Sequence, residues 1–262
     1  MKEKFITVNK SNIRYLEEGQ SDRNIILLHG LGGYAERWIS LIPHLSKKYH
    51  IFAPDLIGYG QSDKPSVDYT LEFFTKFVFD FIEALGIKKT FMIGTSLGGQ
   101  IAVECTATQG PIIEKTVLIS PAGIMRKSTP TLDAYTMAAL YPNQESVKNA
   151  YQMMIGPDKQ VSDISIERFI TNMSRPNAKM VFLSTLLGLK NAPDIFEKLE
   201  RINVPTMIIW GKEDKLIPFE YSKQFVSSIK NCQFMPMEGC GHSPYVEDPE
   251  KLAEIIMKFF SK

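Results

Sequence analysis

The chain has 262 residues, of which 44% are hydrophobic and 23% charged, as in an ordinary globular protein with a sizeable core. Because 30 basic residues are balanced by 29 acidic ones, neither nucleic acid nor a membrane surface is expected as a partner. Three widely spaced cysteines argue against a disulfide framework, and there is neither a signal-peptide pattern nor an apolar run of about 18 residues. These features predict a cytoplasmic protein and leave the oligomeric state open.

Most of the chain alternates short apolar runs of strand length with amphipathic helices. Strands are expected at residues 4–9, 12–18, 24–29, 50–54, 115–120, 205–210 and 233–237, with a further strand and its helix together at about 90–109. Helices are expected at residues 70–85, 220–229 and 249–260, and near 38–49 with a break or kink at Pro43. This alternation predicts an α/β fold with a mostly parallel sheet and helices on both faces.

The alternation pauses in the middle of the chain. Residues 123–200 contain helical patterns punctuated by prolines but no convincing strand. The expected helices cover residues 132–141, 145–155, 164–173, 178–189 and 195–199. We therefore predict a core domain made of residues 1–122 and 201–262, with residues 123–200 forming a helical cap over the sheet.

A short apolar strand, a tight turn and a helix meet at residues 91–100. The turn has the sequence Gly94-Thr95-Ser96-Leu97-Gly98, which is the G-x-S-x-G pattern of a nucleophile elbow. In such an elbow the serine occupies a strained turn with its hydroxyl exposed, while strand and helix pass close behind it. Glycines on both sides permit this approach. Ser96 is therefore the candidate nucleophile.

A serine hydroxyl needs an adjacent base, and that base needs an acid to orient it. His242 is the candidate base, because its small-residue loop follows the last strand and can reach the carboxyl edge of the sheet. Asp214, which follows the strand at 205–210, is the candidate acid. Its competitors are Glu213, Glu247 and Asp248. The remaining histidines are expected to have structural or solvated roles: His29, His44 and His50.

The order serine, acid, histidine, with each residue after its own strand, resembles the cap-domain branch of the α/β-hydrolase fold. Five segments carry the resemblance over essentially the whole chain: residues 29–33 (HGLGG), 55–62 (DLIGYGQS), 94–99 (GTSLGG), 211–214 (GKED) and 241–242 (GH). The resemblance implies an oxyanion hole formed by the backbone N–H groups of Leu31 and Leu97. It also implies catalysis without a metal or an organic cofactor.

Acyl transfer is the chemistry that these residues predict. Ser96 would attack a carbonyl carbon while His242 takes its proton, and water would then hydrolyse the acyl-enzyme. We therefore predict a carboxylesterase acting on small-molecule esters with small to medium acyl groups. Candidate substrate contacts are Trp38, Tyr135 and Arg175. An apolar lining in the cap would come from Tyr135, Met137, Tyr141, Tyr151, Met153, Met154, Met173 and Met180.

Two alternatives remain open. Residues 172–176 (NMSRP) resemble the cap segment of carbon–carbon bond hydrolases that act on meta-cleavage products, which implies a substrate contact by Arg175. Those enzymes usually have Trp directly after the catalytic histidine and Asn before the nucleophile, whereas this chain has Ser243 and Thr95. The other alternative is a hydrolase fold that binds a ligand or partner without catalysis.

Overall fold

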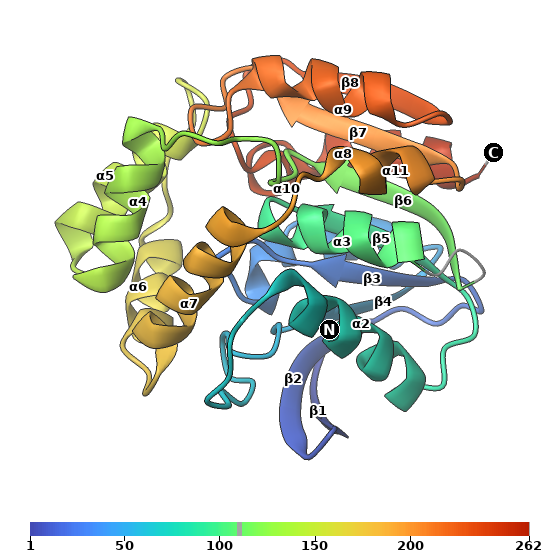
Figure 1. Ribbon diagram of the computed structural model, residues 1–262, viewed down its shortest axis with the longest axis horizontal. Coiled ribbons are helices and arrows are strands. Elements are labelled where there is room, and N and C mark those ends of the chain that lie inside the picture. Colours follow the sequence, from blue (N-terminus) through green and yellow to red (C-terminus); the bar gives the residue numbers. More distant parts are fainter. Residues whose placement is uncertain (109–111, 262) are drawn as a thin grey trace.

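The computed structural model describes residues 1–108 and 112–261, and within them eight strands form one sheet (Figure 1). The strand order is β1-β2-β4-β3-β5-β6-β7-β8; β1, β2 and β4 pair antiparallel, and all further pairs are parallel. The strands are β1 (Lys2–Val8), β2 (Ser11–Glu18), β3 (Asn24–Leu28), β4 (His50–Pro54), β5 (Thr90–Thr95), β6 (Ile113–Ile119), β7 (Thr206–Gly211) and β8 (Cys232–Met237). The predicted α/β fold is confirmed.

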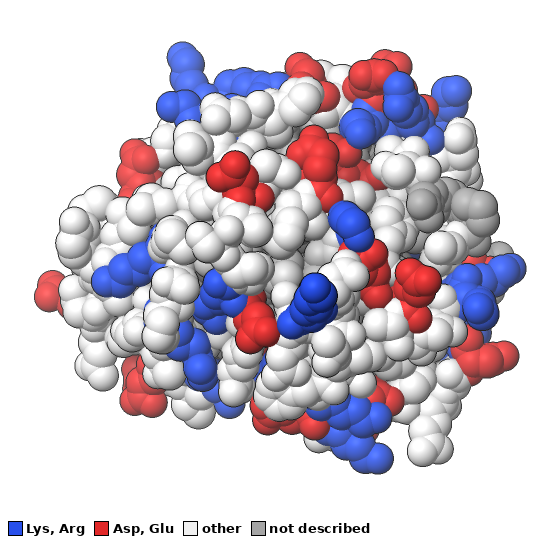
Figure 2. All heavy atoms as spheres, turned by 60° about the horizontal axis from the view of Figure 1, so that its bottom comes forward, with Lys and Arg blue, Asp and Glu red and all other residues white. Residues whose placement is uncertain are grey.

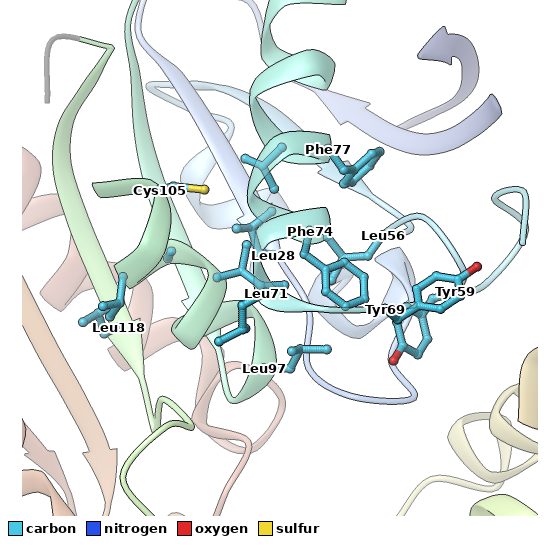
Figure 3. Packing of buried hydrophobic residues seen from close by; sticks show 14 of the residues in the cluster. Leu28, Leu56, Tyr59, Tyr69, Leu71, Phe74, Phe77, Leu97, Cys105 and Leu118 are labelled. Carbon is cyan, nitrogen blue, oxygen red and sulfur yellow. The ribbon is translucent and has the colours of Figure 1, made fainter. Parts of the chain in front are cut away.

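Helices cover both faces of this sheet. They are η1 (Ala35–Trp38), α1 (Ile42–Leu45), α2 (Leu71–Ala84), α3 (Leu97–Thr108), α4 (Pro130–Leu140), α5 (Gln144–Met154), α6 (Asp163–Met173), α7 (Ala178–Asn191), α8 (Phe196–Arg201), η2 (Phe219–Tyr221), α9 (Ser222–Ser228), α10 (Pro244–Glu247) and α11 (Pro249–Phe260). Buried side chains of η1, α1 and α11 share one hydrophobic cluster, and those of α2, α3, α8 and α9 share the other. Figure 3 shows part of the second cluster, including Leu28 of β3, Phe74 of α2 and Leu97 of α3.

Local sequence explains several helix boundaries. Helix α2 begins after Thr70, whose side chain accepts a hydrogen bond from the N–H of Phe73. Pro43 lies in the first turn of α1, where its missing N–H breaks no helical hydrogen bond. The break that the sequence predicts at Pro43 therefore lies before this residue, between η1 and α1. Residue 109, where the sequence places the end of the helix after the elbow, lies outside the described residues.

A buried ionic cluster holds η1 against the sheet. Asp55, at the end of β4, accepts hydrogen bonds from the backbone N–H groups of Ala35 (2.6 Å) and Gln61 (2.8 Å). Arg14 lies 3.4 Å from the Asp55 carboxylate and binds both oxygens of Glu36 at 2.7 and 2.8 Å. Burial raises the pKa of Asp55 to about 6, although the Arg14 guanidinium opposes this shift. Glu36 is thus bound to Arg14 through both of its oxygens, and Arg14 also pairs with Asp55 and Glu3.

Helices α4 to α7 pack on one another beside the sheet (Figure 1). Their shared interior contains the rings of Tyr135, Tyr151, Phe169 and Phe182, with centroid separations of 5.4–6.3 Å. In contrast, α8 packs against α3 and α9 of the sheet layer. We refer to α4–α7 as the cap helices, so that α8, although it begins within residues 123–200, is not one of them.

The surface shows no dominant charge. On the face drawn in Figure 2, acidic and basic side chains are interspersed, in keeping with a net charge of +1. No helix in the described part of the chain combines the length and the apolar character needed to cross a membrane.

Candidate active site

Ser96 lies at the turn between β5 and α3. Its backbone has a left-handed φ of 53°, a conformation that costs a non-glycine residue about 1–2 kcal/mol. The turn is held by two hydrogen bonds: the N–H of Ser96 donates to the carbonyl of Ile119 (3.1 Å), and the carbonyl of Ser96 accepts from the N–H of Ala122 (3.0 Å). Ser96 thereby reaches the wall of a cavity at the carboxyl edge of the sheet.

The two glycines of the elbow are required by close backbone contacts. A Cβ at Gly94 would lie 2.1 Å from the carbonyl oxygen of Gly98. A Cβ at Gly98 would lie 2.2 Å from the carbonyl oxygen of Leu28. Because neither backbone neighbour can swing aside as a side chain can, any larger residue would force β5, α3 and β3 apart.

His242 and Asp214 lie in contact with each other. The imidazole Nδ1 is 2.7 Å from Oδ2 of Asp214, and both side chains are almost completely buried. The other carboxylate oxygen, Oδ1, accepts hydrogen bonds from the backbone N–H groups of Leu216 and Ile217, each at 2.9 Å. These contacts orient the carboxylate, which in turn orients the imidazole. His242 also lines the cavity that Ser96 reaches.

The other acidic and basic candidates have different surroundings. Glu213 is exposed to solvent, and Asp248 caps α11 by accepting from the N–H of Lys251. Fully buried His29 accepts from the N–H of Leu56 through Nε2 (3.0 Å), and its Nδ1–H donates to the carbonyl of Gly30 (2.8 Å). Burial lowers the pKa of His29 to about 4, so it is a neutral structural residue at pH 7.

Glu247 holds the loop that carries His242. Its Oε2 accepts from the backbone N–H groups of Gly241 and Gly156, each at 2.7 Å, and its Oε1 accepts from the N–H of Ser243 at 2.8 Å. The N–H of His242 itself donates to the carbonyl of Met154, at the end of α5. One carboxylate therefore fixes the residues on both sides of His242 and joins their loop to the segment after α5.

We expect Glu247→Gln to loosen this loop. The amide NH₂ must replace one of the two accepting oxygens and would face a backbone donor, which should lower the free energy of unfolding by about 1–3 kcal/mol. Because His242 would be held less firmly, kcat for ester hydrolysis should fall by up to about 10²-fold. Chemical denaturation and steady-state kinetics measure the two effects. The matched control is Glu250→Gln, on the exposed first turn of α11; equal losses in both variants would contradict the role of Glu247.

The backbone N–H groups of Leu31 and Leu97 flank the elbow. Leu97 is the first residue of α3, and no acceptor for either N–H is found among residues 1–108 and 112–261. The loop that carries Leu31 is held by the hydroxyl of Tyr135, which donates to the Leu31 carbonyl at 2.7 Å. A Cβ at Gly30 would lie only 3.1 Å from Cβ of Ser96, so the loop passes close to the serine. Both N–H groups are therefore free to bind a substrate oxygen.

Between the cap helices and the sheet lies a cavity of about 480 Å³. Ser96 and His242 are in its wall, together with side chains of the cap helices and of the loops before and after them. Apolar side chains make up much of its lining: Leu31, Leu97, Met125, Leu132, Met154, Leu186, Leu189, Leu216 and Ile217. Such a volume and lining suit a small organic molecule.

The structure separates the three substrate contacts expected from the sequence. Tyr135 lines the cavity, although its hydroxyl is bound to Leu31. Trp38 is fully buried in the opposite hydrophobic cluster and packs against Tyr245 at a centroid distance of 4.5 Å, so its assignment as a substrate contact is corrected. The side chain of Arg175 donates to Asn172 and lies outside the described cavity lining, so its substrate contact stays a prediction.

The expected apolar lining of the cap is also only partly found. Tyr135, Tyr151 and Met154 line the cavity. Met173 is buried away from the described lining, in the interior shared by the cap helices, and Met153 likewise lies outside that lining. The other three side chains are largely exposed to solvent: Met137, Tyr141 and Met180. Helical periodicity identifies a buried face but does not say which part of that face borders a cavity.

One cavity residue was not predicted from the sequence. Arg37, on η1, is only partly exposed and lines the cavity, where its Nη2 donates to Oγ of Ser243 at 3.3 Å. The sequence feature that could have identified Arg37 is its position shortly after the glycine loop at 29–33, because that loop is expected at the site. A single arginine among 30 basic residues gave no pattern that would have distinguished it.

Comparison with known proteins agrees with the fold. A family model described as the α/β-hydrolase fold matches residues 23–147. The chain has the α/β-hydrolase fold, and the similarities support a hydrolase of that superfamily. Among solved structures it is similar to a meta-cleavage product hydrolase of Pseudomonas fluorescens IP01, with a TM-score of 0.90 and 25% identity over 98% of this chain and 97% of that one.

Two curated relatives that resemble this chain over most of its length have names that describe different hydrolases. A 2-hydroxy-6-oxo-6-(2'-aminophenyl)hexa-2,4-dienoic acid hydrolase of Metapseudomonas resinovorans is 26% identical over 99% of this chain and 91% of that protein. Human monoacylglycerol lipase ABHD6 is also 26% identical, over 91% of this chain and 75% of that protein. These names include both a dienoic acid hydrolase and a monoacylglycerol lipase.

Proposed function

We propose that the protein is a serine hydrolase that cleaves carboxylic esters of small to medium acyl groups. One observation carries this proposal: Ser96, on a left-handed turn, and His242, held by Asp214, border the same cavity of about 480 Å³. In this proposal Ser96 is the nucleophile, His242 the general base and Asp214 the residue that orients the base. The free N–H groups of Leu31 and Leu97 form the oxyanion hole.

Acylation begins when the substrate carbonyl oxygen binds the N–H groups of Leu31 and Leu97. Oγ of Ser96 attacks the carbonyl carbon while its proton moves to Nε2 of His242. Asp214 keeps the proton of His242 on Nδ1, so that Nε2 is the accepting nitrogen. The tetrahedral oxyanion is stabilised by the two N–H groups, and the imidazolium then protonates the leaving alcohol as the ester bond breaks.

Deacylation repeats these steps with water as the nucleophile. His242 removes a proton from the water, which attacks the acyl carbon, and the same two N–H groups stabilise the second oxyanion. The proton then returns to Oγ of Ser96 as the carboxylic acid leaves. One water is consumed for each ester, and no redox step is involved.

The cavity supports the proposed size of the acyl group. Its apolar side chains come from the core loops and from the cap helices, including Leu132 of α4 and Leu186 and Leu189 of α7. Because α4 to α7 lie over the site, a long alkyl chain would have to leave the cavity and lose apolar contacts. The size of the cavity, more than the chemistry at Ser96, should therefore limit chain length.

Carbon–carbon hydrolysis is the second candidate, and similarity to meta-cleavage product hydrolases favours it. Three features of this chain count against it. Ser243 and Thr95 replace the Trp and Asn expected in those enzymes, and Arg175 lies outside the described cavity lining. Ester hydrolysis needs only the nucleophile, base, acid and oxyanion hole, all of which have candidates here.

A substrate panel tests the proposal. We expect kcat/KM for 4-nitrophenyl butyrate and octanoate to exceed that for the hexadecanoate by at least about tenfold, because the longest chain does not fit the cavity. The panel should also contain a lactone, a thioester and a 2-hydroxy-6-oxo-hexa-2,4-dienoic acid. Preferred turnover of the dienoic acid would favour the second candidate. Equal turnover of all ester chain lengths would contradict a closed acyl pocket.

A further inference from the structure

Arg37 presents a cation to the substrate cavity. It lies on η1, directly before fully buried Trp38, so its backbone is firmly anchored. Its guanidinium lies over the rings of Tyr151, from the cap helix α5, and Tyr245, from α10, with centroid distances of 5.3 and 5.8 Å.

The charge of Arg37 has no protein counterion in the described residues. None of the carboxylates at positions 1–108 and 112–261 forms an ion pair with it, and neighbouring Glu36 is bound to Arg14 through both oxygens. Of the five N–H donors of the guanidinium, one is bound by Oγ of Ser243 and another interacts with the side chain of Tyr245. A partly buried cation with unused donors is costly unless a ligand supplies an anion.

The mouth of the cavity is also rich in positive charge. Exposed Arg126 and Lys127, on the loop before α4, and exposed Lys190, near the end of α7, belong to the cavity lining, and of these Arg126 is paired with Asp194 at 3.5 Å. Asp133 is the one carboxylate in the described lining. In a chain whose total charge is only +1, this local excess should attract anions from solution.

We propose that Arg37 binds a carboxylate of the substrate, and that the substrates are monoesters of dicarboxylic acids. This inference rests on the proposed ester hydrolysis and names its substrate class. The guanidinium offers a bidentate site for a carboxylate, with Oγ of Ser243 beside it. Because Ser243 follows His242 directly, the anion would be held near the reacting ester and would orient it. The apolar lining accommodates the methylene chain between the ester and the acid.

Paired substrates of equal chain length test this assignment. Mono-4-nitrophenyl adipate and suberate are compared with 4-nitrophenyl hexanoate and octanoate, after subtraction of spontaneous hydrolysis. In the wild-type protein we expect kcat/KM to be higher for the acids. In Arg37→Met the ratio of acid to neutral substrate should fall by about 10- to 100-fold, mainly through KM, because one charge-assisted contact is lost. Arg37→Lys should retain part of the ratio, since it keeps the charge but not the fork.

The control is Arg201→Gln, on α8, which removes an exposed arginine outside the described cavity lining and should leave the ratio unchanged. A wild-type protein without preference for the acids would overturn the proposal. An equal loss of kcat/KM on acid and neutral substrates in Arg37→Met would also overturn it. That result would mean that Arg37 only joins Tyr151 to Tyr245.

A binding measurement separates this proposal from the proposed catalysis. Monomethyl adipate is titrated by calorimetry into Ser96→Ala and into Ser96→Ala/Arg37→Met. Binding that is weakened at least about tenfold by the second change supports the carboxylate site even if no ester in the panel is hydrolysed. Equal binding by the two variants, or none to either, refutes it independently of turnover.

Discussion

Ser96→Ala is expected to lower kcat for ester hydrolysis by at least about 10⁴-fold without loss of the fold. The variant removes the attacking oxygen but keeps a Cβ on the strained turn, so the backbone with φ of 53° is under the same strain as before. Stability should therefore change by less than about 1 kcal/mol. Steady-state kinetics with 4-nitrophenyl butyrate and a thermal unfolding curve measure the two quantities.

Ser120→Ala is the matched control for this variant. Like Ser96, Ser120 directly follows a strand and has a positive φ (41°), but it is fully buried and lies outside the described cavity lining. It should keep its activity and its labelling by a serine-directed phosphonate, whereas Ser96→Ala should lose both. Normal turnover in Ser96→Ala would exclude Ser96 as the nucleophile. Absence of labelling in the wild-type protein would favour a fold that binds ligands without catalysis.

Asp214→Asn should lower kcat by about 10⁴-fold, because it changes the tautomer of His242. Oδ1 of Asp214 accepts from the N–H groups of Leu216 and Ile217, so an asparagine will keep its carbonyl oxygen there. Its NH₂ group then faces Nδ1 of the imidazole and makes that nitrogen an acceptor. The proton moves to Nε2, which can no longer take the proton of Ser96.

The neighbouring acid provides the control for this prediction. Glu213→Gln changes an exposed side chain next to Asp214 and should alter kcat by less than about threefold, in keeping with the small effects of most surface substitutions. Kinetics for the two variants on the same ester decide between the carboxylates. If Glu213→Gln is the more damaging change, the assignment of the acid is wrong.

Short-range sequence features were sufficient to predict the architecture and the elbow. Apolar runs such as residues 24–28 and 206–211 are buried on both faces, which is the pattern of central parallel strands. Gly94 and Gly98 could be assigned their role because the close approach that excludes a side chain occurs within a few residues of Ser96. The order of Ser96, Asp214 and His242 along the chain predicted which histidine and which acid belong together.

Only the tertiary structure decided which other residues border the site. Arg37 reaches Ser243 across 206 positions of sequence, and Tyr135 reaches Leu31 across 104, distances over which no local pattern operates. Glu247, considered from the sequence only as a competing acid, instead binds three backbone N–H groups around His242.

The same limit applies to the two expected substrate contacts that lie outside the described cavity lining. Trp38 and Arg175 have the residue types of substrate contacts, but the packing of η1 places Trp38 in the cluster shared with α11, and the end of α6 places Arg175 beside Asn172. A sequence determines its strands, helices and tight turns through contacts between near neighbours. The walls of a cavity between a cap and a sheet come from segments that meet only after folding. The presence of the Arg37 charge at this site could therefore be found only from the folded structure.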